Sequence, residues 1–188
     1  ARLPHPLTEM RATFRASNAG FSIDELVARS GEATLRMSAQ QSGFEMGKSP
    51  LQLEASIWQL ELDRQLLDAL PAQLQNHWYK YLPAGQVDAD LKLRFDGKTW
   101  YPQLAVECLN VSFTHHKFPY RLSDGKGSVT LKDDVLEVHL IAYSRSQQVR
   151  VDAEMQSATS GPTGWFEAKG QGPELDEKLF NAMKDKPR

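Results

Sequence analysis

The sequence predicts a mainly β protein: a curved antiparallel sheet, either a repeating β-groove or a half-open sandwich, with a short kinked amphipathic helical insertion at about residues 63–82. Over most of the chain, apolar and polar residues alternate with a period of two, which is typical of strands that have one covered face and one wet face. Short turn sequences such as Asp96-Gly97 and Asp124-Gly125 separate these stretches. Antiparallel hairpins are therefore expected, because parallel strands need crossovers of about a dozen residues or more.

Composition and charge limit the class of protein. The 188 residues, 40% hydrophobic and 24% charged, suffice for a folded domain with a sizeable core and exclude a disordered chain. A net charge of −2 provides no field that attracts nucleic acid, so no nucleic-acid partner is expected. No apolar run reaches the roughly 18 residues of a spanning helix, so no membrane span is expected within these residues. The single cysteine, Cys108, has no partner for an internal disulfide.

The first strands precede the insertion. Alternation is clear in two stretches, 35–39 and 51–57, whose apolar members are Leu35, Met37, Ala39, Leu51, Leu53, Ala55 and Ile57. At Ile57/Trp58 the alternation slips by one residue before it resumes at Leu60 and Leu62. Such a slip predicts a β-bulge, which bends the strand and curves the sheet.

The insertion changes the period from two to between three and four. Asp63 is suited to cap a helix, Pro71 is expected to end or kink its first part, and Pro83-Ala84-Gly85 is expected to stop it. The apolar face of this helix consists of Leu66, Leu67, Leu70, Leu74 and Trp78. Two roles stay open for it: a cover packed over the core of the sheet, or a lid or membrane-touching element.

The strands after the insertion have the most regular pattern, above all at 86–95. Their apolar faces consist of Val87, Ala89, Leu91, Leu93, Phe95, Leu104, Val106, Leu136, Val138, Leu140, Val149 and Val151. A second slip, at Cys108/Leu109, predicts another bulge. Periodicity alone favours a closed core for these side chains over an open groove.

The chain also resembles itself. Residues 26–39 align with 140–153 at an offset of 114, and 62–70 align with 175–183 at an offset of 113. We therefore expect three parts: the end of one repeat unit at 1–61, one unit of about 113–115 residues at 62–174, and the helix start of the next unit at 175–188. The 188 residues would then be a fragment of about 1.65 units, 188/114, in which neighbouring repeats cover each other's open edges.

Two longer segments carry a resemblance to a known family. They are LQLEASIWQLELDRQLLDALPAQLQNHWYKYLPAGQVDADLKLRFDG at 51–97 and FPYRLSDGKGSVTLKDDVLEVHLIAYSRSQQVRVDAEMQS at 118–157. Their order of strand, short amphipathic helix ending in Leu-Pro, Pro-x-Gly restart, alternating strands and Pro-Tyr-x-Leu resembles that of the AsmA-like and TamB-like repeating β-groove proteins of the cell envelope. The resemblance is one of pattern, and no catalytic motif belongs to it.

The resemblance implies a function as well as a fold. It implies a non-enzymatic segment whose apolar sheet face binds or conducts phospholipid acyl chains in lipid transport and outer-membrane biogenesis. It also implies a location in the cell envelope or periplasm, with membrane anchoring through a segment outside this fragment. In that case the twelve apolar strand residues line a lipid groove. The alternative is a structural or protein-interaction β module of a large repeat protein, with a closed core and no ligand; a carbohydrate-active β domain is a third hypothesis.

Residues with catalytic or metal-binding chemistry are few and dispersed. His115 and His116 are adjacent and would point to opposite faces of a strand, so they do not make a metal site. Cys108 has apolar neighbours and no adjacent base, which indicates a buried structural thiol. Asp88 and Asp90 share the polar side of one strand, where solvation is the expected role. We therefore predict no catalytic residue, no metal and no cofactor.

Overall fold

The computed structural model describes residues 7–45, 47–70, 72–114, 120–158, 161 and 163–170. Ten strands form one antiparallel sheet in chain order, so each strand pairs with its neighbours along the chain. The sheet is not closed, and the described residues contribute no second layer of strands. The predicted mainly β, antiparallel fold is therefore confirmed, in the form of a single curved sheet.

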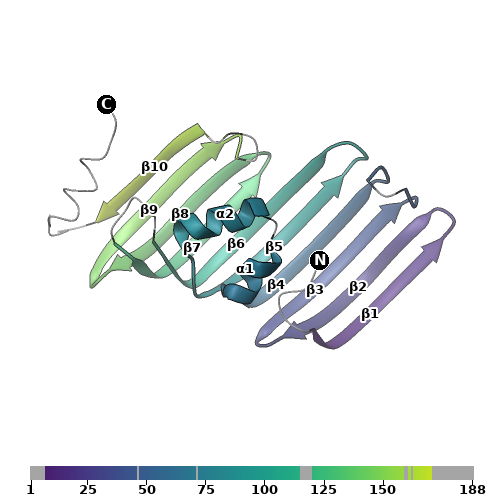
Figure 1. Ribbon diagram of the computed structural model, residues 1–188, viewed down its shortest axis with the longest axis horizontal. Helices are drawn as coiled ribbons and strands as arrows, with labels where there is room; N and C mark the ends of the chain where they lie inside the picture. The colour runs from purple at the N-terminus through teal and green to yellow at the C-terminus, as the bar shows by residue number, and fades with distance from the viewer. Residues whose placement is uncertain are drawn as a thin grey trace.

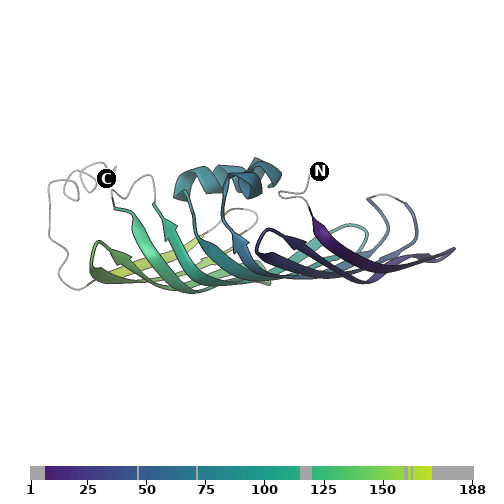
Figure 2. The ribbon, with the colours of Figure 1, turned by 90° about the horizontal axis from the view of Figure 1, so that it is seen from below.

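The elements follow the chain with short connections, apart from the helical insertion. They are β1 (Thr8–Ser17), β2 (Gly20–Ser30), β3 (Ala33–Ser42), β4 (Leu51–Glu61), α1 (Arg64–Ala69), α2 (Ala72–Tyr81), β5 (Gln86–Phe95), β6 (Trp100–Phe113), β7 (Leu122–Lys132), β8 (Val135–Ser144), β9 (Gln147–Gln156) and β10 (Thr163–Gly170). Figure 1 shows the strands side by side from β1 to β10, with both helices over the middle of the sheet. Seen edge-on in Figure 2, the sheet is a shallow trough with the helices above its concave side.

The helical insertion begins and bends where the sequence predicts. The Asp63 carboxylate accepts a hydrogen bond from the backbone N–H of Leu66 at 2.8 Å, which is the predicted cap. The first helix ends at Ala69 and the second begins at Ala72; Pro71, the expected cause of the kink, lies outside the described residues. The side-chain amide of Gln75 donates to the carbonyls of Leu67 and Leu70 at 3.1 and 3.0 Å, and so ties α2 to the end of α1.

Both predicted bulges are present. The register of β4 against β5 shifts between Ile57 and Leu60, and that of β6 against β7 shifts between Cys108 and Val111. Within the first shift Gln59 has a φ of 56°, and its N–H donates to the Asp88 carboxylate at 2.7 Å. Because bulges bend and twist a strand, these shifts account for part of the curvature of the trough.

The buried core lies toward one end of the strands. A cluster of buried side chains comprises Val87, Cys108, Val111, Leu122, Leu140, Ala142 and Val151. Leu60 and Leu62, which lead from β4 into the insertion, pack against this cluster, and Leu67 of α1 is buried as well. Toward the other end of the sheet fewer side chains are fully buried, Phe95 being one.

The segments used to predict the repeat occupy comparable places. Residues 26–39 lie in the hairpin of β2 and β3, and residues 140–153 lie in the hairpin of β8 and β9. The expected boundary between 1–61 and 62–174 falls between β4 and β5, which pair directly within the one sheet. The expected third part, 175–188, lies outside the described residues, so the repeat stays a prediction.

Candidate functional site

The concave side of the sheet presents one apolar row that crosses all ten strands. Residues paired across neighbouring antiparallel strands lie on the same face, so the register traces the row from strand to strand. We call it the central row; in strand order it consists of Ala12, Leu26, Met37, Ala55, Leu91, Leu104, Leu131, Leu136, Met155 and Gly164. None of its ten members is polar.

A second row runs parallel to the central row on the same face. From β2 to β10 it consists of Ala28, Leu35, Ile57, Ala89, Val106, Val129, Val138, Ala153 and Phe166. We call the two rows together the apolar face. The strand-by-strand alternation therefore adds up to a surface that is continuous across the sheet.

The structure brings all twelve predicted groove residues to this side of the sheet, but at different depths. Val87, Phe95, Leu140 and Val151 are buried. The other eight remain partly exposed: Ala89, Leu91, Leu93, Leu104, Val106, Leu136, Val138 and Val149. The partly exposed residues dominate the two rows, which means that side chains of the described residues leave the middle of the apolar face incompletely covered.

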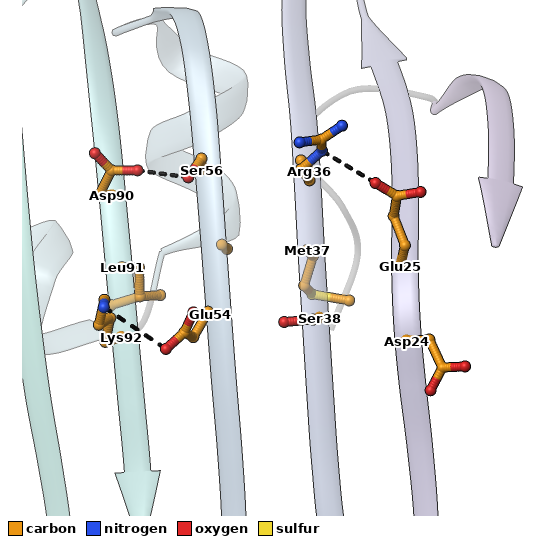
Figure 3. Close-up of a pocket in the computed structure, with 11 residues that line it drawn as sticks. Asp24, Glu25, Arg36, Met37, Ser38, Glu54, Ser56, Asp90, Leu91 and Lys92 are labelled. Atoms are coloured by element: carbon orange, nitrogen blue, oxygen red, sulfur yellow. Dashed lines mark hydrogen bonds and ion pairs between the residues drawn. The ribbon is translucent and has the colours of Figure 1, made fainter. Parts of the chain in front are cut away.

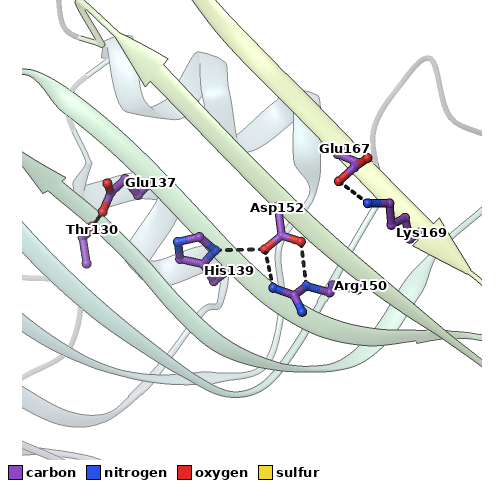
Figure 4. A network of polar contacts seen from close by, with 7 residues as sticks. All are labelled: Thr130, Glu137, His139, Arg150, Asp152, Glu167 and Lys169. Carbon is purple, nitrogen blue, oxygen red and sulfur yellow. Dashed lines mark hydrogen bonds and ion pairs between the residues drawn. The ribbon is translucent and has the colours of Figure 1, made fainter.

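The predicted helix residues cover this face only in part. Leu67 is buried, whereas Leu66, Leu70 and Trp78 are intermediate and Leu74 is 50% exposed. In Figures 3 and 4 the helices lie behind the sheet, on the side away from the polar side chains drawn. The insertion therefore lies over the apolar face, with a half-exposed leucine on its own surface.

The opposite, convex face is polar and is organised by cross-strand pairs. Arg36 of β3 pairs with Glu25 of β2 at 3.2 Å, and Lys92 of β5 pairs with Glu54 of β4 at 3.7 Å. These side chains border an open depression, shown in Figure 3, where four acidic and two basic groups alternate across the strands. Exposed ion pairs of this kind contribute little to the free energy of folding. We therefore interpret this depression as a solvated part of the surface.

A denser polar cluster lies on the same face over β8 and β9. Asp152, whose side chain is 12% exposed, accepts from Arg150 Nε at 2.7 Å and lies 2.9 Å from His139 Nδ1. The hydrogen bond from Arg150, with the one to His139, lowers the pKa of the Asp152 carboxyl below its ordinary value. Figure 4 shows these groups converging on Asp152, with the separate Glu167–Lys169 pair on β10 beside them.

The sequence does not predict this cluster when His139 is considered as an isolated residue. The signal that could have found it lies in the short turn between β8 and β9. A two-residue turn at Arg145 and Ser146 fixes the β8–β9 register, and that register places His139 opposite Asp152. The next residue across is Ser128, which forms no hydrogen bond with His139 in the described chain.

The remaining reactive groups are placed for structure. Burial, with a smaller effect of the Glu107 charge, raises the pKa of the Cys108 thiol to about 11, which keeps it protonated at neutral pH. The described residues contain no group of three or more His, Cys, Asp or Glu side chains able to hold a metal ion; His115 and His116 lie outside them. Among the described helices, none has the length and apolar character required to cross a membrane.

Fold and surface together define a class: an open, single-layer antiparallel sheet with one apolar and one polar face. No family model, no curated protein and no solved structure matches the chain.

Proposed function

We propose that the apolar face binds acyl chains of phospholipids, and that the protein is a non-enzymatic, AsmA-like segment of a lipid-handling protein of the cell envelope. The observation that carries the proposal is the central row, which is apolar on every strand and partly exposed at Leu91, Leu104 and Leu136. Contiguous apolar patches that remain accessible on a soluble domain mark binding surfaces.

The dimensions of the row suit acyl chains. Strands lie about 4.8 Å apart, so nine intervals make the central row roughly 43 Å long. A bilayer core of about 30 Å contains two acyl layers, so one chain extends about 15 Å, or about three strand intervals. Each methylene removed from water contributes about 0.8 kcal/mol, so even a partly covered acyl chain would gain several kcal/mol on this face.

The polar face supports the same proposal. Its cross-strand pairs, such as Lys92 with Glu54, keep the convex side solvated while the concave side holds the acyl chain. The envelope location, and anchoring to a membrane through a segment outside this chain, belong to the proposal and rest on the resemblance alone.

The test uses two neighbouring residues of β6 that point to opposite faces. Leu104 lies in the central row, and Ala105 is exposed on the polar face, opposite Asp90. The unaltered chain is incubated with vesicles that contain a fluorescent phosphatidylethanolamine, and co-elution of label with protein is measured. We expect Leu104→Lys to reduce labelling about tenfold, because it places an ammonium group in the acyl path. The matched control, Ala105→Lys, should bind as the unaltered chain does.

Circular dichroism of both variants shows whether they fold. Should Leu104→Lys unfold, the smaller change Leu104→Ser is used in the same assay. The proposal is wrong if the unaltered chain acquires no label, or if a folded Leu104 variant acquires as much label as the Ala105 variant.

A second candidate is a protein-interaction β module, and one observation favours it. The two outer strands, β1 and β10, are exposed at each of their residues, and among the described strands each pairs with one neighbour only. Free strand edges are places where another chain can add a strand.

A further inference from the structure

The two free edges of the sheet have complementary side chains. β1 presents Arg11, Thr13 and Arg15 on its polar side and Ala12 and Phe14 on its apolar side. β10 presents Trp165, Glu167 and Lys169 on its polar side and Phe166 and Ala168 on its apolar side. Phe14 and Phe166 are 69% and 63% exposed, so each edge carries a large uncovered aromatic ring. Native sheets normally protect such edges.

We propose that these edges bind each other, so that β10 of one copy of this chain pairs with β1 of a second copy. The strand directions permit it. Ten antiparallel strands in chain order make β1 and β10 run in opposite directions, so a second copy placed beside β10 in the same orientation continues the antiparallel alternation. Its apolar face then lies on the same side as that of the first copy.

One register satisfies both faces at once. When Phe166 lies opposite Ala12 of the second copy, Glu167 lies opposite Arg11 and Gly164 lies opposite Phe14. Large rings then meet small residues on the apolar side, and opposite charges meet on the polar side. Arg11 forms no ion pair within the part of the chain that the structure describes, so it is free to meet this carboxylate. Lys169 reaches the bulged start of β1, where Glu9 carries a further negative charge.

The pairing is head to tail, and so it does not close after two copies. Each added copy again exposes one β1 and one β10, which produces an open series of chains. The apolar face continues across each junction, because Phe166 and Ala12 both belong to it. The inference goes beyond the proposed lipid binding and does not depend on it, since edge pairing requires no lipid.

Charge reversal at one pair of residues tests the inference. Sedimentation velocity of the full chain, without lipid and up to about 1 mM, should show concentration-dependent association. Glu167→Arg places two guanidinium groups opposite each other at the junction, and Arg11→Glu places two carboxylates there. Each variant alone should therefore associate at least about tenfold more weakly. An equimolar mixture of the two variants should associate again, and so should the double variant, because both restore opposite charges at the junction.

A matched control leaves the junction unchanged. Lys92→Glu also reverses one charge, but in β5 on the polar face, away from both edges, and its association should equal that of the unaltered chain. Circular dichroism confirms that each variant folds. A chain that stays monomeric over the full range overturns the inference, and so does association that the single reversals leave unchanged or that the mixture does not restore. Because lipid labelling is measured separately, failure here leaves the lipid proposal standing, and the reverse also holds.

Discussion

The single thiol of the chain reports whether the core under the helical insertion is closed. Cys108 is 6% exposed and lies in the buried cluster with Val87 and Leu140. The pKa rises from an ordinary 9.0 to about 11 because burial disfavours the thiolate. At pH 8 this change reduces the thiolate fraction about a hundredfold. A thiolate of higher pKa is also more nucleophilic, here by about tenfold, which offsets part of this loss. The net effect of the pKa change is that the thiol reacts about tenfold more slowly.

Burial slows the reaction further, because a bulky disulfide reagent reaches Cys108 only after local opening of the core. We therefore expect the native thiol to react with such a reagent at least about tenfold more slowly at pH 8 than the same chain unfolded in urea. The rate should also keep rising, about tenfold per pH unit, beyond pH 9, since the group is still protonated there.

The matched control moves the thiol to the polar face. In a Cys108→Ser, Ala105→Cys variant the thiol lies at an exposed position three residues away, and it should react at a rate close to that of the unfolded chain. The reasoning is refuted if native Cys108 reacts as fast as this exposed thiol, or if its rate levels off near pH 9.

Three further predictions concern stability, each measured by urea unfolding or hydrogen exchange. Leu82 follows α2 with a φ of 44°, a conformation that favours glycine. The free energy of opening of the α2 amides, measured by hydrogen exchange, should therefore be about 1 kcal/mol higher in Leu82→Gly than in Leu82→Ala. Gly127→Ala should lower the free energy of unfolding by about 2 kcal/mol or more, since a Cβ there would clash with the His139 carbonyl oxygen, whereas Gly170→Ala should be nearly neutral. The folded pKa of Asp152 is lowered below 3.8, so its stabilisation is present above that pH and is lost as the pH falls through the folded pKa. Asp152→Asn should therefore be more destabilising at pH 7 than at pH 2. An equal effect of Asp152→Asn at both pH values, a destabilising Leu82→Gly relative to alanine, or equal costs at the two glycines would each contradict the structure.

Local patterns in the sequence were sufficient to predict the single elements. The alternation at 86–95 reflects a strand with two unlike faces, and the slips at Ile57 and Cys108 reflect real shifts of register. Asp63 could be recognised as a cap because its carboxylate needs only the N–H groups of the next few residues. Each of these features depends on residues close together in the chain.

Features that depend on several strands were harder to predict. Periodicity alone favoured a closed core because alternation shows that a face is apolar without showing what covers it, and Leu91 and Leu104 prove to be only partly covered. The register shift in β2 between Ile23 and Leu26 was missed, because the polar pair Asp24-Glu25 there resembles ordinary strand polarity. The central row emerges only when all nine registers are known together.

The chain-order topology of the sheet has a consequence for how such a protein forms and changes. Each of the ten described strands pairs only with the strands made just before and just after it, so pairing can proceed from one end as the polypeptide emerges, without waiting for distant residues. Loss or gain of two consecutive strands would leave the remaining partners and both faces in place. The length of the sheet can therefore change by whole hairpins, and each added hairpin lengthens both of its faces.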